Sequence, residues 1–323
     1  MWLEVFWLAH AVLAAMPQGA IDSHIHLWTC DNERFPIADG APSLPTHLAQ
    51  AGTAEEMHES MTAAGVQGAL VVQPINYGQD YSYMEEAARR FPGFFKGMLV
   101  ADPSAEDPVR ALRERVALAP EFWVGVRFNP YKFPDGAMAN EAGRLLFAAA
   151  GELRMPVGFM PFKGLVEHVG AVEELMKSSP STPAIIDHWG FFLQPATGFG
   201  DDRVLVEESW AHLLRLGREY PQVHVKISGM FRNAADPPPF VGLGSRLEEL
   251  LEAFGSRRIL WGSDAPYFLD FGRYESSLAF QQWPAWDRLD AEQRDAILHR
   301  NAERLFGAWG GLRLPQDGTS QEF

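Results

Sequence analysis

Eight short apolar runs, each followed by a longer amphipathic stretch, constrain the fold of this chain more than any other feature of its sequence. The runs have the length of buried strands, and the stretches between them have the spacing of surface helices. This alternation is typical of α/β proteins with a parallel sheet. The expected strands are Ala20–His26, Gln67–Gln73, Phe95–Ala101, Trp123–Phe128, Met155–Met160, Ala184–His188, Val223–Ser228 and Ile259–Ser263.

The number of strands separates the two common parallel architectures. Eight strands alternating with helices predict an α/β fold of the distorted (β/α)8 TIM barrel type. A doubly wound open sheet usually stops at about five or six strands and has a glycine-rich turn after the first. The first run ends in His24-Ile25-His26 instead, so we expect the barrel. The expected helices are Ala54–Ala64, Tyr83–Phe91, Pro108–Leu118, Glu141–Leu153, Gly164–Ser178, Val204–Tyr220 and Leu243–Phe254.

We expect a single domain, because no low-complexity linker and no repeat other than the βα unit interrupts the 323 residues. The barrel is expected at residues 20–307, between an apolar N-terminal segment (1–19) and a C-terminal tail (308–323). The N-terminal segment is short for a membrane span and has no basic residue before Arg34. We therefore expect a packed helix in a cytoplasmic protein, with a targeting segment of a secreted or organelle protein as the alternative.

Charge limits the partners of the chain. Its 27 basic and 42 acidic residues give a net charge of −15, and no stretch is rich in Lys or Arg. Nucleic acid and anionic membranes therefore find no basic surface to bind. The single Cys30 allows no intramolecular disulfide, which fits a reducing compartment. We expect a small-molecule partner, an anionic one being attracted by a local basic cluster, and leave open whether the protein is a homo-oligomer.

Three long segments follow expected strands: Leu27–Gln50, Trp189–Arg203 and Gly229–Gly242. In a barrel, the segments that follow strands lie at the C-terminal rim, where active sites are built. We expect a site at this rim, walled by these loops.

Polar side chains end the first expected strand. Because side chains alternate along a strand, Asp22, His24 and His26 are expected on one face and Ile21 and Ile25 on the other. Two imidazoles side by side at the rim can act in proton transfer or bind a metal.

Two further expected strands end at the same rim, one in a histidine and the other just before a carboxylate. The sixth run ends in Asp187-His188, and alternation predicts that only one of the two faces the barrel axis. The last run is followed by Asp264, opposite the first-strand histidines. We expect a catalytic role for this carboxylate, although turns and helix caps also use Asp.

Inward-facing polar groups are expected on the remaining strands. Alternation points Arg127 and Asn129 into the barrel, and it does the same for Lys226. A buried guanidinium needs a carboxylate, supplied by either a structural ion pair or a substrate, and the same alternatives hold for Lys226. Gln73, at the end of the second strand, is a candidate to orient a substrate oxygen.

These motifs together resemble the amidohydrolase-related branch of the amidohydrolase superfamily. The nearest likeness is to sugar-acid lactonases and pyrone dicarboxylate hydrolase, with zinc-dependent decarboxylases more distant. The resemblance spans Ile21 to about Gly307 and implies that His24, His26, His188 and Asp264 are the site residues. It rests on Asp22-x-His24-x-His26-Leu27-Trp28, Gly125–Asn129, Asp187–Gly190, Lys226–Gly229, Leu260–Pro266 and Asn301–Gly307.

One departure of this sequence from the family pattern concerns the metal ligands. Metal-dependent members of the family have a further histidine at the end of strand five, and Pro156–Pro161 contains none. We therefore favour catalysis that requires no cofactor. The alternative is one divalent ion such as zinc, held by His24, His26 and Asp264 with help from His188.

The expected function is hydrolysis of a lactone or related cyclic ester of a small acidic or sugar-acid substrate. Asp264 would be the general base, while His188, His24, His26 and Arg127 would polarise the carbonyl. Lys226, Gln73, Trp28 and Asn129 would complete the substrate pocket. The alternatives are a metal-dependent decarboxylase, in which Arg127 binds a carboxylate, and a binding barrel without turnover.

Overall fold

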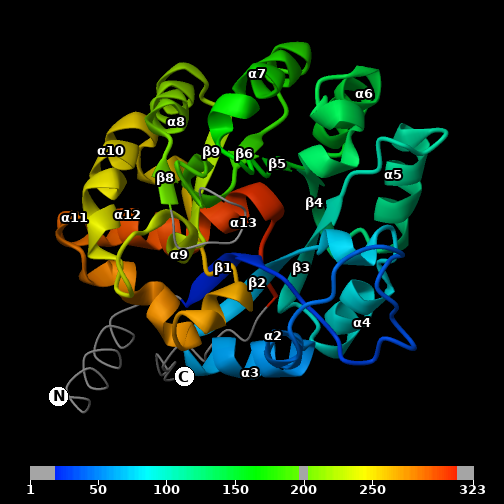
Figure 1. Cartoon of the computed structure of the whole chain (residues 1–323), viewed down its shortest axis with the longest axis horizontal. Coiled ribbons are helices and arrows are strands. Elements are labelled where there is room, and N and C mark those ends of the chain that lie inside the picture. The colour runs from blue at the N-terminus through cyan, green and yellow to red at the C-terminus, as the bar shows by residue number, and fades with distance from the viewer. Residues whose placement is uncertain (1–18, 196–202, 311–323) are drawn as a thin grey trace, which may run out of the picture.

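The strands form one nearly closed parallel barrel with helices outside it, as the computed structural model shows for residues 19–195 and 203–310 (Figure 1). Sheet order is β1-β2-β3-β4-β5-β6-β9-β10. The bounds are β1 Ala20–Ile25, β2 Val66–Val72, β3 Phe95–Val100, β4 Trp123–Phe128, β5 Val157–Phe159, β6 Ala184–Ile186, β9 Val223–Ser228 and β10 Ile259–Gly262. The prediction of a single-domain (β/α)8 barrel with eight strands is confirmed.

The seven helices expected between the strands are all present, most of them within three residues of the predicted bounds. They surround the strands in Figure 1. The α-helices are α2 Thr46–Ala51, α3 Ala54–Ala63, α4 Ser82–Arg90, α5 Pro108–Leu118, α6 Glu141–Glu152, α7 Val169–Ser178, α8 Glu207–Glu219, α9 Met230–Asn233, α10 Gly244–Phe254, α11 Pro284–Asp287, α12 Ala291–Asp295 and α13 Asn301–Phe306.

The segment after β6 differs from the long loop expected there. It contains β7 (Leu193–Pro195), which pairs antiparallel with β8 (Arg203–Leu205) outside the barrel. The expected helix Val204–Tyr220 therefore starts late, at Glu207, because its first residues belong to β8. A three-residue strand has no periodicity of its own to show in a sequence.

The first strand also departs from simple alternation. Its register against β2 is irregular between Asp22 and Ile25, and Ile21 packs inside the barrel with Leu70 and Met98. The prediction that Asp22 shares a face with His24 and His26 is wrong, because Asp22 binds the hydroxyl of Tyr274 (2.7 Å). The irregular register changes the face that side chains take partway along the strand.

The barrel closes between its first and last strands. A single parallel bridge joins Ile25 to Ala265. Beside it, the Asp264 amide donates to the His24 carbonyl (2.8 Å), and the His26 amide donates to the Ala265 carbonyl (2.7 Å). The site residues of both strands are therefore fixed by the backbone that closes the barrel.

The opposite end of the barrel is filled by apolar side chains. Phe306 and Trp309 belong to the interior cluster, and Trp309 lies over Gly68 of β2. This contact extends the packed barrel past residue 307. The expectations for residues 1–18 and 311–323 lie outside the described residues.

Among the described residues, no helix combines the length and apolar character that crossing a bilayer requires.

Substitution of Gly262 tests the closure. A Cβ there would lie 2.8 Å from His24 Cβ and 2.9 Å from the His24 backbone nitrogen, and β1 cannot move away without breaking the bridge. We expect Gly262→Ala to lower the free energy of unfolding by about 1–3 kcal/mol, measured by urea denaturation. In the control Gly170→Ala, within α7, the new Cβ meets nothing within 4 Å, so stability should not fall. Equal stability of both variants would contradict this account.

Candidate active site

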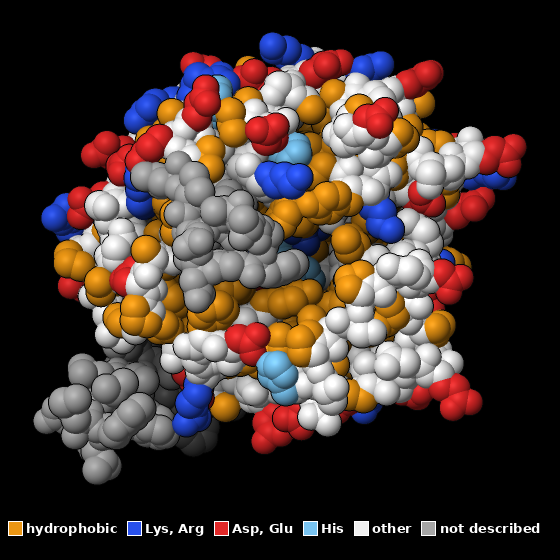
Figure 2. Space-filling view, in the orientation of Figure 1, with side chains coloured by type: hydrophobic (Ala, Val, Ile, Leu, Met, Phe, Trp, Pro, Cys, Tyr) orange, Lys and Arg blue, Asp and Glu red, His pale blue; other side chains and the backbone are white. Residues whose placement is uncertain are grey.

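Residues from five strands meet in one buried cluster at the C-terminal end of the barrel. The face seen in Figure 2 is hollowed near its middle, and basic and histidine side chains lie in this depression. Every member of the cluster is buried, although seven of the eight carry an ionisable side chain. The cluster consists of His24 and His26 from β1, Arg127 from β4, Asp187 and His188 after β6, Lys226 and Ser228 from β9, and Asp264 after β10.

Asp187 is the anion at the centre of this cluster. Its Oδ2 lies 3.2 Å from Arg127 Nη2, and its Oδ1 lies 3.4 Å from both Lys226 Nζ and His24 Nδ1. Burial alone would raise the pKa of Asp187, but Lys226, His24 and Arg127 outweigh burial and hold the pKa well below its usual value. Of the alternatives for Arg127 and Lys226, the structure therefore shows the buried ion pair.

The prediction that only one of Asp187 and His188 faces inward is wrong. The strand ends at Ile186, and His188 has a φ of 50°, so the two neighbours do not follow strand alternation. The His188 ring lies 4.4 Å from the His24 ring, and its Nδ1 is 2.9 Å from Ser228 Oγ. Left-handed backbone is uncommon for residues other than glycine and is concentrated at functional sites.

Asp264 shows the same backbone conformation, with a φ of 65°. Its Oδ2 accepts a hydrogen bond from Arg232 Nε at 2.5 Å, while Oδ1 lies 3.4 Å from His26 Nε2 and 3.9 Å from His24 Nε2. Burial would raise the pKa of Asp264, but Arg232 and the histidines hold it well below its usual value. The carboxylate is ionised and keeps one oxygen directed at the histidines.

Burial keeps two of the imidazoles neutral. It lowers the pKa of His188 to about 3 and that of His24 well below its usual value, in His24 with the further effect of Lys226. A neutral imidazole retains a nitrogen lone pair, which metal binding and proton acceptance both require.

Three of these residues fit a divalent metal ion. One ligand atom each of His24, His188 and Asp264 lie within 4.8 Å of one another. His24 Nε2 and Asp264 Oδ1 are buried without a hydrogen-bond partner, and such orphaned atoms are costly unless something fills the space between them. Neutral imidazoles and an ionised carboxylate are the ligand states that a metal such as zinc requires.

His26 is held differently. Its Nδ1 lies 2.7 Å from the Val72 carbonyl oxygen, which can only accept, so Nδ1 carries a hydrogen. The other ring nitrogen, Nε2, faces Asp264 Oδ1. The three-residue group differs from the predicted set by having His188 in place of His26.

The expectation of catalysis without a metal finds no support in this geometry, and the alternative of one divalent ion does. Arg127 and Lys226 are cations that would disfavour a dication nearby, and Asp187, which lies between them, offsets part of their charge.

Three predicted substrate contacts have other partners in the structure. Gln73 Nε2 donates to the carbonyls of Gly78 (3.1 Å) and Asp80 (3.2 Å), so its amide holds the loop after β2. Asn129 accepts from the Tyr131 amide and caps the turn after β4. Trp28 is buried beside Tyr77. Contact of these side chains with a substrate stays a prediction.

The sequence analysis missed two residues of the site. Arg232 lies on α9, where strand alternation no longer applies, and its guanidinium is 5.2 Å from the Tyr267 ring. Tyr267 in turn lies 5.5 Å from the His26 ring. The only sequence signal was that both residues lie within a few positions of a strand end at the rim.

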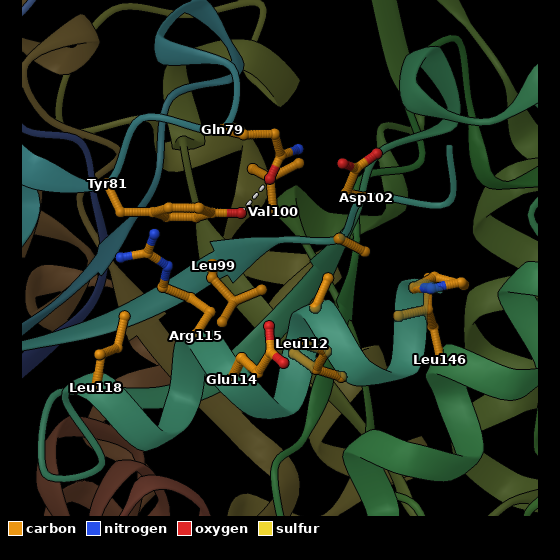
Figure 3. A pocket seen from close by; sticks show the side chains of 13 residues that line it. Gln79, Tyr81, Leu99, Val100, Asp102, Leu112, Glu114, Arg115, Leu118 and Leu146 are labelled. Atoms are coloured by element: carbon orange, nitrogen blue, oxygen red, sulfur yellow. Dashed lines mark hydrogen bonds between the residues drawn. The ribbon is translucent and has the colours of Figure 1, made fainter. Parts of the chain in front are cut away.

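A cavity of about 320 Å³ lies between α5, the end of β3 and the segment before α4 (Figure 3). Several of its polar side chains already have partners. Tyr81 donates to Gln79, and Arg115 pairs with Glu85 (2.9 Å) and covers the Tyr81 ring. It contains none of the cluster residues, so the barrel end is the candidate active site.

Comparisons with known proteins agree with the fold. The amidohydrolase family model matches residues 21–308, and the chain belongs to this family. It is a hydrolase of the amidohydrolase superfamily, as the motifs predicted. An L-fucono-1,5-lactonase of Burkholderia ambifaria is 22% identical over 285 residues, covering 82% of this chain and 86% of that protein. A 2-pyrone-4,6-dicarboxylate hydrolase of Comamonas testosteroni is 25% identical over 281 residues, covering 82% and 83%.

Solved structures show the same fold. A probable 2-pyrone-4,6-dicarboxylic acid hydrolase from Acinetobacter baumannii, crystallised with citric acid, has a TM-score of 0.70 at 22% identity and covers 90% of this chain and 100% of that one. An amidohydrolase from Burkholderia multivorans with bound zinc has a TM-score of 0.68 at 20% identity and covers 90% and 99%.

Removal of the central anion tests the charge balance. Asp187→Asn would leave Arg127 and Lys226 buried without a compensating carboxylate. We expect the free energy of unfolding to fall by about 3–5 kcal/mol in urea denaturation. The control Glu152→Gln breaks an exposed pair with Arg113 and should change stability by less than about 1 kcal/mol. A similar small change for both variants would show that Asp187 is not needed to balance the buried cations.

Proposed function

We propose that this protein opens a lactone or related cyclic ester of a small acidic substrate by attack of water. The observation that carries the proposal is Asp264, an ionised and buried carboxylate with one oxygen free among histidines. A reacting water needs a proton acceptor close by, and the neighbouring donors can stabilise the charge that then develops on the carbonyl oxygen. The activities named for the lactonase and pyrone hydrolase relatives support this reaction type.

Asp264 acts as the general base in this mechanism. Arg232 fixes the carboxylate through Oδ2, so Oδ1 is the oxygen that accepts a proton from the attacking water. The hydroxide oxygen bonds to the ester carbonyl carbon, and the carbonyl electrons move to the oxygen. When the ring bond breaks, the proton on Asp264 passes to the alkoxide, which yields a hydroxy acid and restores the carboxylate.

The histidines and Arg127 surround the reacting carbonyl. Neutral His24 and His188 present ring nitrogens without a positive charge, and Arg127 has a buried Nε–H without a hydrogen-bond partner among the described residues. A donor such as this Nε–H is worth about 3 kcal/mol when it points at a developing oxyanion, whereas a ring nitrogen that keeps its lone pair is the atom that would hold an ion. Arg232 is 25% exposed and is the cation best placed to meet a substrate carboxylate arriving from solvent.

His24, His188 and Asp264 would hold one divalent ion such as zinc. When bound, such an ion polarises a carbonyl and lowers the pKa of water. Lys226 and Asp187 then have a supporting role, since both contact His24 Nδ1 and so direct its other edge towards the site.

The decarboxylase alternative is less well supported. It assigned Arg127 to the substrate carboxylate, and that guanidinium is already paired with Asp187.

Asp264→Asn tests the assignment of the base. We expect kcat on the lactone substrate to fall by about 10²–10⁴, because an amide cannot accept the proton of water. The control Asp270→Asn changes an exposed carboxylate six positions along the chain that pairs with His47, and it should leave kcat unchanged. Turnover of Asp264→Asn at the wild-type rate would exclude Asp264 as the base.

Metal removal tests the second part of the proposal. Purified protein should contain about one zinc or similar ion per chain by mass spectrometry, and dialysis against a chelator should lower its melting temperature and its lactonase rate. Addition of one divalent ion should restore both. Protein that carries no metal and keeps its rate after chelation would show that the side chains act alone, as the sequence analysis favoured.

A further inference from the structure

Aromatic side chains follow five consecutive strands of the barrel at the active-site end. Strands β4, β5, β6, β9 and β10 are neighbours in the sheet, and each is followed by at least one ring within a few residues. We call this set the aromatic rim. It consists of Tyr131, Phe162, Phe191, Phe231, Tyr267 and Phe271.

One side of the rim forms a continuous path of rings from the cluster to solvent. Phe191 lies edge-on to His188 with ring centres 5.1 Å apart. Phe162 lies 5.8 Å from Phe191, and Tyr131 lies 5.8 Å from Phe162. Phe191 is buried, Phe162 is half-buried, and Tyr131 is 57% exposed, so the path opens outward.

The other side of the rim begins at the carboxylate. Arg232, which binds Asp264, covers the rings of Phe231 (4.8 Å) and Tyr267 (5.2 Å). Phe231 stacks on Phe271 with ring centres 4.6 Å apart, and Phe271 is 45% exposed. This side has a cation at its inner end, whereas on the path to Tyr131 the rings contact one another directly from His188 outward.

The exposed apolar surface of the described residues gathers at this end. Of the five large hydrophobic side chains that are most exposed, Tyr131, Val241 and Phe271 lie on segments that follow barrel strands. Figure 2 shows hydrophobic side chains around the depression on this face. Exposed apolar surface beside a catalytic cluster is typical of a ligand site.

We propose that the substrate carries, beyond its reacting ester, a flat aromatic or apolar arm that lies along Phe191, Phe162 and Tyr131. This inference rests on the proposed function and narrows its substrate class. A compact polyhydroxylated lactone would meet ring faces along this path instead of the hydrogen-bonding groups that its hydroxyls need. An aryl or alkyl arm moves out of water when it lies on those ring faces, and it stacks on them.

A matched pair of lactones tests the proposal. One is δ-valerolactone, and the other is the same ring with a phenylethyl arm on the carbon next to the ring oxygen. We expect kcat/KM to be at least about tenfold higher for the armed lactone, mainly through a lower KM. Equal values, or a preference for a polyhydroxylated δ-lactone over the armed one, would overturn the proposal.

Variants locate the preference on the path. Phe162→Ser should lower the ratio of armed to unarmed kcat/KM by about tenfold, and Tyr131→Ser by about threefold. Tyr131→Phe should keep the ratio, since the ring and not the hydroxyl makes the contact. Tyr131 is exposed, so its variants keep the test valid if Phe162→Ser fails to fold. The control Leu145→Ser, on the outer helix α6, should leave both rates unchanged. A ratio that no rim variant alters would exclude this path.

The two proposals fail in different ways. If wild-type protein hydrolyses neither of these lactones nor a δ-lactone that carries a carboxylate, the proposed function fails. Binding of the corresponding pair of δ-lactams, which do not turn over, then decides the role of the rim by calorimetry. A tighter armed lactam, with the difference reduced about threefold in Tyr131→Ser, supports the arm site, whereas equal binding overturns it.

Discussion

The buried carboxylate of Asp187 is the interaction on which the site depends. A guanidinium and an ammonium lie inside the barrel, and burying both would be strongly destabilising without an anion within a few ångströms. Because Asp187 pairs with these two cations, Asp264 is not needed to pair with them. The protein therefore has two buried carboxylates with separate roles, one that neutralises structural cations and one that keeps an oxygen available beside the histidines. The separation lets neutral imidazoles and an ionised base coexist in one buried cluster.

The sequence predicted the parts of the structure that follow from periodicity. Eight apolar runs defined the strands, and alternation correctly turned Lys226 and Arg127 inward. Alternation failed wherever the backbone is not a regular strand. The irregular register of β1 sends Asp22 to Tyr274 instead of the cluster.

The site residues that strand alternation does not place share one physical cause, which is that the chain leaves the strand before it reaches them. His188 and Asp264 are in left-handed backbone, and Arg232 is on a short helix. Asp187 was not expected together with His188, because only one of two adjacent residues can face the axis of a regular strand. The place of Asp264 after the last strand indicated a catalytic role, and the family resemblance added His188, but neither gave any indication of the Asp187 contacts or of the aromatic rim.

The closure of the barrel has a consequence for how the protein opens. Strands β1 and β10 are far apart in sequence, yet their seam has one regular bridge, supplemented by the Asp22 side chain on the Ser263 amide and Ser23 on the Trp261 carbonyl. Each of the other neighbouring strand pairs shares three or four paired positions. The seam is therefore the place where local opening takes the least free energy and where amide hydrogens would exchange soonest. Since His24 lies on one side of it and Asp264 on the other, any ligand that joins these two side chains fastens the first strand of the barrel to the last.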